Sequence, residues 1–144
     1  MHADIISHVP CPPKLLKEMG KVAALIGRLY DENREVSITL TDDKHIQALN
    51  KTYRGLDEPT DVLSFALSEA DEPSFDAPDS LGDVIISIER AAAQAEQFNH
   101  SLRREIIFLE VHGLLHLLGF DHINPDDQRL MEREQNFILK ELRL

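Results

Sequence analysis

Hydrophobic and polar residues follow two different periods along this chain, and their order predicts a mixture of strands and helices. Alternation with a period of two, rich in β-branched residues, is typical of strands, whereas apolar residues three and four positions apart mark one face of a helix. Val36, Ile38 and Leu40 show the first pattern, and residues 81–88 are so apolar that we expect them at the centre of a sheet. Strands are predicted at residues 4–9, 35–40, 62–67 and 81–88.

The helical period is clearest in residues 14–31, and polar caps and glycines indicate where the other helices begin and end. Apolar faces are expected at Leu15, Met19, Val22, Ile26 and Leu29 of the first helix and at Leu130, Phe137, Ile138 and Leu142 of the last. Helices are predicted at residues 14–31, from a cap at Thr41 or Asp42 to Tyr53, at residues 89–99, from a cap at Ser101 to Leu118, and from Asp126 or Asp127 onward. Because hairpin and helical connections are both possible in this order, we expect a single α+β domain over residues 1–144, a small mixed β-sheet surrounded by helices.

The composition adds few constraints beyond the class of protein. Hydrophobic residues make up 42% of the chain and charged residues 28%, which is typical of a soluble globular protein and excludes disordered, collagen-like and membrane proteins. The first residues have neither the basic start nor the apolar stretch of a signal peptide. The single cysteine, Cys11, cannot form an internal disulfide, so we expect a cytoplasmic protein without a membrane partner.

The net charge of −11 argues against nucleic-acid binding, but its distribution weakens that argument. Residues 57–83 contain nine acidic side chains and no lysine or arginine, whereas the first 56 residues are nearly neutral. A basic stripe, defined as Lys14, Lys17, Lys21 and Arg28, lies opposite the apolar face of the first helix. It could contact an RNA backbone or a ribosomal surface, or form an ordinary solvated face, and in either case we expect weak non-specific affinity for RNA.

Three histidines near the end of the chain are the strongest candidates for chemistry. His112 and His116 are four residues apart and share one face of a helix that is apolar over most of its circumference, and Gly119 then lets the chain turn and bring back His122. Three imidazoles with an open fourth position match a catalytic zinc site, where bound water can ionise near neutral pH. Core or capping histidines with ordinary hydrogen-bond partners are the alternative. The sequence thus predicts a zinc site on a buried helix and the turn after it.

This segment lacks the general base of an HExxH metalloprotease, because Gly113 stands where that motif has glutamate. Glu105 shares the histidine face but lies about 10 Å away along the helix axis, too far to be a ligand. Asp121 is expected either to orient a ligand histidine or to be an ordinary turn aspartate. Peptide hydrolysis by the HExxH mechanism is therefore disfavoured.

Three segments resemble the YbeY family, in the family's order. Residues 112–122 read HGLLHLLGFDH and match the family pattern H-G-x-L-H-L-x-G-x-D-H throughout. Residues 53–65, YRGLDEPTDVLSF, resemble its second signature, and residues 81–87, LGDVIIS, resemble its central strand. Glu58 stands where the family often has lysine, which removes a positive charge near the expected cleft, and Ala66 stands where proline is common.

The resemblance implies a small α+β fold and a single-strand-specific endoribonuclease that acts in 16S rRNA 3′ end maturation and ribosome quality control. It implies one zinc ion held by His112, His116 and His122, with Arg54 as the other functional residue near the metal. The expected partners are single-stranded RNA, the 16S rRNA precursor, and the small ribosomal subunit or its proteins, but not DNA. A planar guanidinium suits this role, since it can hold two oxygens of a phosphodiester as charge develops there.

Several other residues remain open between a functional and a structural role. From the residues alone, Arg54 could instead be a surface arginine paired with Asp57 or Glu58. Asp61 and Asp83 could hold Arg54 or a ligand histidine, or they could cap or solvate strand ends. Thr60, Ser64 and Ser87 lack the accompanying pattern of a serine nucleophile, and His2, His8, His45 and His100 are expected at the surface. An acidic loop around Phe75 could gate the cleft. Two further functions stay open: a metal-dependent hydrolase of a non-nucleic-acid substrate, and a non-catalytic ribosome-assembly protein with structural zinc.

Overall fold

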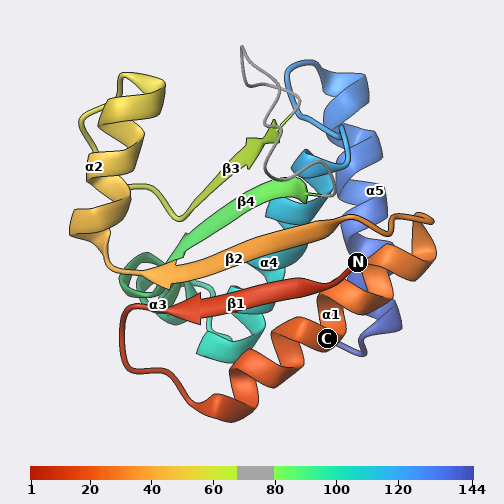
Figure 1. Cartoon of the computed structure of the whole chain (residues 1–144), viewed down its shortest axis with the longest axis horizontal. Helices are drawn as coiled ribbons and strands as arrows, with labels where there is room; N and C mark the ends of the chain where they lie inside the picture. Colours follow the sequence, from red (N-terminus) through yellow and green to blue (C-terminus); the bar gives the residue numbers. More distant parts are fainter. Residues whose placement is uncertain (68–79) are drawn as a thin grey trace.

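A mixed sheet organises the molecule (Figure 1). The computed structural model describes residues 1–67 and 80–144, and within them four strands pair in the order β1-β2-β4-β3. The strands are β1 (Ala3–Ser7), β2 (Glu35–Thr41), β3 (Val62–Ala66) and β4 (Ser80–Ser87). β1, β2 and β4 are parallel, and β3 pairs antiparallel with β4 at one edge. The predicted α+β class is confirmed, and residues 81–87 lie in an interior strand as expected. The acidic loop around Phe75 falls outside the described residues.

The helices occupy both faces of this sheet, most of them on one side. They are α1 (Pro13–Leu29), α2 (Asp43–Arg54), α3 (Ile88–Gln97), α4 (Leu102–Leu117) and α5 (Pro125–Glu141). Figure 1 shows α3, α4 and α5 behind the sheet. Helix α4 contacts the helices α1, α3 and α5 and the strands β3 and β4. No helix in the described part of the chain is long and apolar enough to cross a membrane.

The hydrophobic core forms where alternate side chains of β2 and β4 meet α1 and α4. Ile38 and Ile86 are fully buried there, together with Met19 of α1 and Leu114 of α4. Because α4 is apolar over most of its circumference, it can be buried between the sheet and three other helices. The helix that carries two of the candidate ligands is therefore held on several sides, which fixes their direction.

Caps explain where the helix boundaries differ from the sequence prediction. Ser87 accepts a hydrogen bond from the Arg90 amide at 3.2 Å, so helix α3 begins at Ile88, which the sequence had suggested as the end of a strand. Asn124 caps α5 by accepting from the Asp127 amide at 2.9 Å, so this helix begins at Pro125, earlier than predicted. Asp42, rather than Thr41, caps α2.

The expected apolar face of α5 is partly wrong. Leu130 and Phe137 are 41% and 47% exposed, whereas Met131 and Gln135 are buried with Ile138. The face of α5 that packs against the protein is therefore the one with Met131, Gln135 and Ile138, and α4 is among the elements it contacts. This packing brings Gln135 toward the histidines.

Candidate metal centre and active-site cleft

The three predicted histidines converge at one point of the structure. Ring centroids are 4.8 Å apart for His112 and His116, 5.1 Å for His116 and His122, and 5.9 Å for His112 and His122. One nitrogen from each ring lies within 4.8 Å of the others, so together they could hold a metal ion. Three imidazoles are a ligand set that suits zinc, and they fit a site with a further position for water or substrate.

The turn after α4 explains how His122 reaches the other two rings. Gly119 has φ +103°, a left-handed conformation that favours glycine, and its amide bonds to the His116 carbonyl at 3.0 Å. Asp121 then accepts a hydrogen bond from the Ile123 amide at 2.8 Å, which closes the next turn around His122. Asp121 is therefore a turn aspartate, and its negative charge also acts to raise the pKa of His116.

Burial keeps the two helical imidazoles neutral near neutral pH. Desolvation lowers the pKa of His112 and of His116 below the ordinary histidine value, and the neighbouring His122 lowers both further. A neutral imidazole offers a lone pair to a cation, whereas a protonated ring does not. The imidazoles of His112 and His116 are thus suited to bind a metal ion and poorly suited to take up a proton.

Gln135 of α5 is a site residue that the sequence reasoning missed. Its side chain is only 5% exposed and forms a hydrogen bond with the His112 ring, which acts to raise the pKa of that histidine. The carboxamide oxygen is the group that can accept from an imidazole N–H, so this contact fixes the ring's tautomer and direction. The available signal was a polar residue at helical spacing between the apolar Met131 and Ile138.

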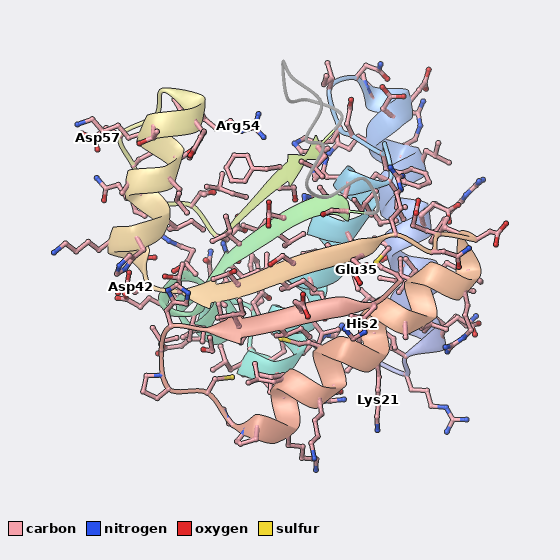
Figure 2. The ribbon with its side chains drawn as sticks, in the orientation of Figure 1. His2, Lys21, Glu35, Asp42, Arg54 and Asp57 are labelled. Carbon is pink, nitrogen blue, oxygen red and sulfur yellow. The ribbon has the colours of Figure 1, made fainter. Side chains whose placement is uncertain are left out.

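Arg54 lies on the wall of the same cleft as the histidines. It ends α2, and Figure 2 shows its side chain extending from that helix toward β3. Its Nη2 donates to the Ser64 carbonyl at 2.8 Å, and the guanidinium lies 5.1 Å from the centre of the Phe65 ring. The cleft has a volume of about 530 Å³, and Arg54 lines it together with the three histidines. The fold thus brings Arg54 to the same cavity as His112, which is 58 positions further along the chain, and the other two histidines.

The two candidate aspartates have different positions. Asp61 lines the cleft and accepts hydrogen bonds from the Val62 amide at 2.8 Å and from Gln94 of α3 at 3.2 Å. Its charge also acts to raise the pKa of His112. Asp83 lies on the other face of the sheet, opposite Phe65 in the strand register, and burial raises its pKa. Asp61 therefore belongs to the surroundings of the histidines, and Asp83 does not.

Gly113 explains why the HExxH glutamate is absent. A Cβ at this position would lie 2.6 Å from Cγ1 of Val84, closer than real side chains approach. Ser64 also donates to the Gly113 carbonyl at 3.1 Å, so α4 lies close against β3 and β4 here. A glutamate side chain at residue 113 therefore has no room, which explains why this helix does not carry the HExxH pattern.

The remaining candidates have partners that account for them. Glu105 lies 2.5 Å from Nε2 of His100, so its carboxylate is engaged with that ring rather than with His112, His116 and His122. His100 is accordingly half-buried and paired, which corrects the expectation that it is a surface residue. Ser87 donates to Asp43 at 2.6 Å in addition to capping α3, and Thr60 contacts the Asp61 carboxylate at 3.4 Å.

The basic stripe is exposed along α1, where Lys14, Lys17, Lys21 and Arg28 all reach solvent. Figure 2 shows Lys21 at the opposite side of the view from Arg54. The basic stripe is thus separate from the cleft, and its contact with RNA or a ribosome remains a hypothesis.

Comparisons with known proteins agree on one family. The family model described as Endoribonuclease YbeY matches residues 13–143. Endoribonuclease YbeY of Desulfitobacterium hafniense is 49% identical over 133 residues, covering 90% of this chain and 85% of the relative. The protein of the same name from Lysinibacillus sphaericus is 44% identical over 138 residues, covering 92% and 85%. The solution structure of TM1509 from Thermotoga maritima aligns with a TM-score of 0.64 at 25% identity, covering 98% of this chain and 91% of that one.

Proposed function

The chain belongs to the endoribonuclease YbeY family, and from that premise we propose that it is a zinc-dependent, single-strand-specific endoribonuclease. The substrate is the 16S rRNA precursor, and the reaction serves 3′ end maturation and ribosome quality control in the cytoplasm. One observation carries the proposal: Arg54 and three mutually close imidazoles line one cleft. This combination unites a metal-binding group with a phosphate-binding group.

His112, His116 and His122 would hold one zinc ion. When bound, zinc supplies a Lewis acid and lowers the pKa of coordinated water. The fit rests on three features of the donor set: nitrogen ligands, pKa values of His112 and His116 that burial lowers, and a ring orientation that Gln135 fixes. In the described ranges, 1–67 and 80–144, the metal-capable group consists of these three side chains.

Arg54 is positioned to stabilise the charge that develops on a phosphodiester. A guanidinium presents a planar fork of N–H donors that matches two non-bridging oxygens. The Ser64 carbonyl and the Phe65 ring hold this group against β3, so little ordering remains to be done when substrate binds. Asp61 accepts a hydrogen bond from the Gln94 side chain, and its negative charge acts on His112.

The charge distribution suggests how the substrate arrives. With a net charge of −11, the protein attracts RNA weakly by electrostatics alone. Recognition would then depend on the metal, on Arg54 and on the small ribosomal subunit or one of its proteins, which would present the precursor RNA. We therefore expect the purified protein to cleave free RNA only at high RNA concentrations, that is, with a high KM.

The two other functions make different demands on the site. A structural zinc is closed by a fourth protein ligand, whereas the three imidazoles found here open onto a cleft of about 530 Å³. A guanidinium that faces the same cavity suits an anionic substrate such as a phosphodiester better than a neutral one. Both observations favour RNA cleavage.

The test compares wild type with His116→Ala and Arg54→Ala, each assayed for bound metal and for cleavage of single-stranded and duplex RNA. Wild type is expected to bind one zinc ion and to cut only the single strand. His116→Ala should lose both metal and cleavage, and Arg54→Ala should keep the metal and lose cleavage.

Matched controls replace residues of the same type away from the cleft. His8 and Arg133 are both exposed, so His8→Ala and Arg133→Ala should behave as wild type. Equal cleavage by His116→Ala and wild type would refute the zinc mechanism, and unchanged cleavage by Arg54→Ala would refute the assigned role of Arg54.

A further inference from the structure

A second cavity lies across the sheet from the histidine cleft. Its volume is also about 530 Å³, and it lies between α2 and the face of the sheet that points away from α4. The strand register places Phe65 opposite Asp83, and Thr39 opposite Ile85, so all four side chains share this face. The intervening residue Val84 points the other way, toward Gly113. We refer to this cavity as the aromatic pocket.

Two aromatic rings and a guanidinium meet at the aromatic pocket. Tyr53 and Phe65 are in edge-to-face contact with centroids 5.4 Å apart, and the Arg54 guanidinium lies over Phe65. Tyr53 is 66% exposed, so its ring is accessible to a ligand in the pocket. Aromatic faces and guanidinium planes are the surfaces on which proteins stack unpaired nucleobases.

The polar groups of the aromatic pocket suit a base better than a phosphate. Asp83 contributes a carboxylate, which repels phosphate but accepts hydrogen bonds from the exocyclic amino group of a base. Asp83 is exposed at this face of β4, so its carboxylate is accessible to a base that enters the pocket. Ile85 and Leu49 add apolar walls on either side.

Arg54 connects the aromatic pocket to the histidine cleft. It lines both cavities, and it is anchored to the Ser64 carbonyl of β3, the edge strand between them. An RNA strand that places a phosphate against Arg54 can therefore place the attached base on the far side of β3.

We propose that the aromatic pocket is a nucleobase subsite, which receives one unpaired base of the RNA next to the phosphodiester that is cut. The inference rests on the proposed function for its substrate. Tyr53 and Phe65 stack on the base, and Asp83 accepts from its amino group, so cytosine is preferred to uracil. A base held in a duplex is stacked and paired and cannot enter, which accounts for selectivity toward single strands.

The test measures RNA binding separately from RNA cleavage. Metal-free protein is titrated with fluorescent single-stranded oligocytidine and oligouridine, and metal-loaded protein is assayed for kcat and KM on the same RNAs. Tyr53→Leu and Phe65→Leu should each weaken binding and raise KM by about 5- to 150-fold, the usual range for losing a stacked base, with a smaller change in kcat. Asp83→Asn should reduce the preference for cytidine.

Controls separate this inference from loss of fold and from failure of the proposed function. Phe137→Leu replaces an exposed aromatic ring on α5 and should bind as wild type, and the exposure of Tyr53 keeps its variant folded. If metal-loaded wild type does not cut RNA while Tyr53→Leu still weakens binding, the proposed function fails and the subsite stands. If RNA is cut and Tyr53→Leu and Phe65→Leu match Phe137→Leu in binding and KM, the subsite is refuted.

Discussion

The cleft on one side of β3 gathers three imidazoles, whereas the aromatic pocket on the other side gathers two aromatic rings, and Arg54 lines both. The imidazoles depend on rigidity, since α4 is buried between the sheet and three other helices. The aromatic pocket depends on exposure, since its ring Tyr53 is mostly open to solvent. Under the two proposals, the first cavity would hold the metal for cleavage and the second would bind a base of the RNA. Substitutions should therefore separate the two.

The largest effect is expected from His116→Ala. Loss of one of three ligands should reduce metal binding beyond detection and lower cleavage by about 10³-fold or more, since a metal stabilises developing charge by several kcal/mol. Base binding in the aromatic pocket should remain, because His116 does not line it. Metal analysis measures the loss of metal, and oligonucleotide titration measures RNA binding. A parallel loss of RNA binding would contradict the idea that the two cavities act separately.

Arg54→Ala should affect both cavities, in line with its position between them. We expect kcat to fall by about 10²-fold, as for the loss of one preorganised donor, and RNA affinity to fall as well, while zinc content is unchanged. Steady-state kinetics with metal analysis measure these changes, with Arg133→Ala as the matched control. A lower kcat with unchanged RNA affinity would show that Arg54 does not contribute to RNA binding at the aromatic pocket.

Gln135→Leu tests the support of the ligands without touching the ligands themselves. Loss of the hydrogen bond to His112 should weaken metal affinity by about 10-fold, with little change in RNA binding at the aromatic pocket. Competition with a metal chelator gives the affinity. Gln128→Leu is the control, because Gln128 lies on the same helix but is exposed and contacts Glu132. Equal zinc affinities in the two variants would show that Gln135 does not position His112.

Gly113→Ala probes the contact that holds α4 against the sheet. The new methyl group would lie 2.6 Å from the side chain of Val84, and such overpacking should cost about 1–3 kcal/mol of stability. Gly20→Ala, where the nearest atom is 3.8 Å away, should instead be neutral or stabilising. Denaturant unfolding distinguishes them, and equal stability of both variants would contradict the close approach.

The smallest effect is a pH dependence of the metal-free protein. Burial lowers the pKa of His112 and His116, so the unfolded chain binds protons at pH values where the native imidazoles remain neutral. By linkage, the free energy of unfolding should fall as pH drops below about 6.5. His116→Asn should flatten this dependence in thermal unfolding with chelator present, whereas His8→Asn should leave it unchanged. A wild-type slope in His116→Asn would show that burial of His116 does not contribute.

The sequence predicted those features that depend on local pattern. The spacing of His112 and His116 and the position of Gly119 are visible in the chain, because helical geometry and a left-handed glycine act over a few residues. The approach of Arg54 to the histidines came only from family resemblance, since it requires α2, β3 and α4 to be assembled. Gln135 and the aromatic pocket were missed for the same reason. Their side chains meet only after the sheet has formed.

We propose above that one metal ion, held by three histidines, enables the cleft to cut single-stranded RNA. The most direct measurement is a titration of metal-free protein with zinc while cleavage of single-stranded RNA is followed. We expect the activity to rise linearly and to saturate at one zinc per chain, and His116→Ala to stay inactive throughout. Full activity before zinc is added, or equal activity of His116→Ala, would contradict it.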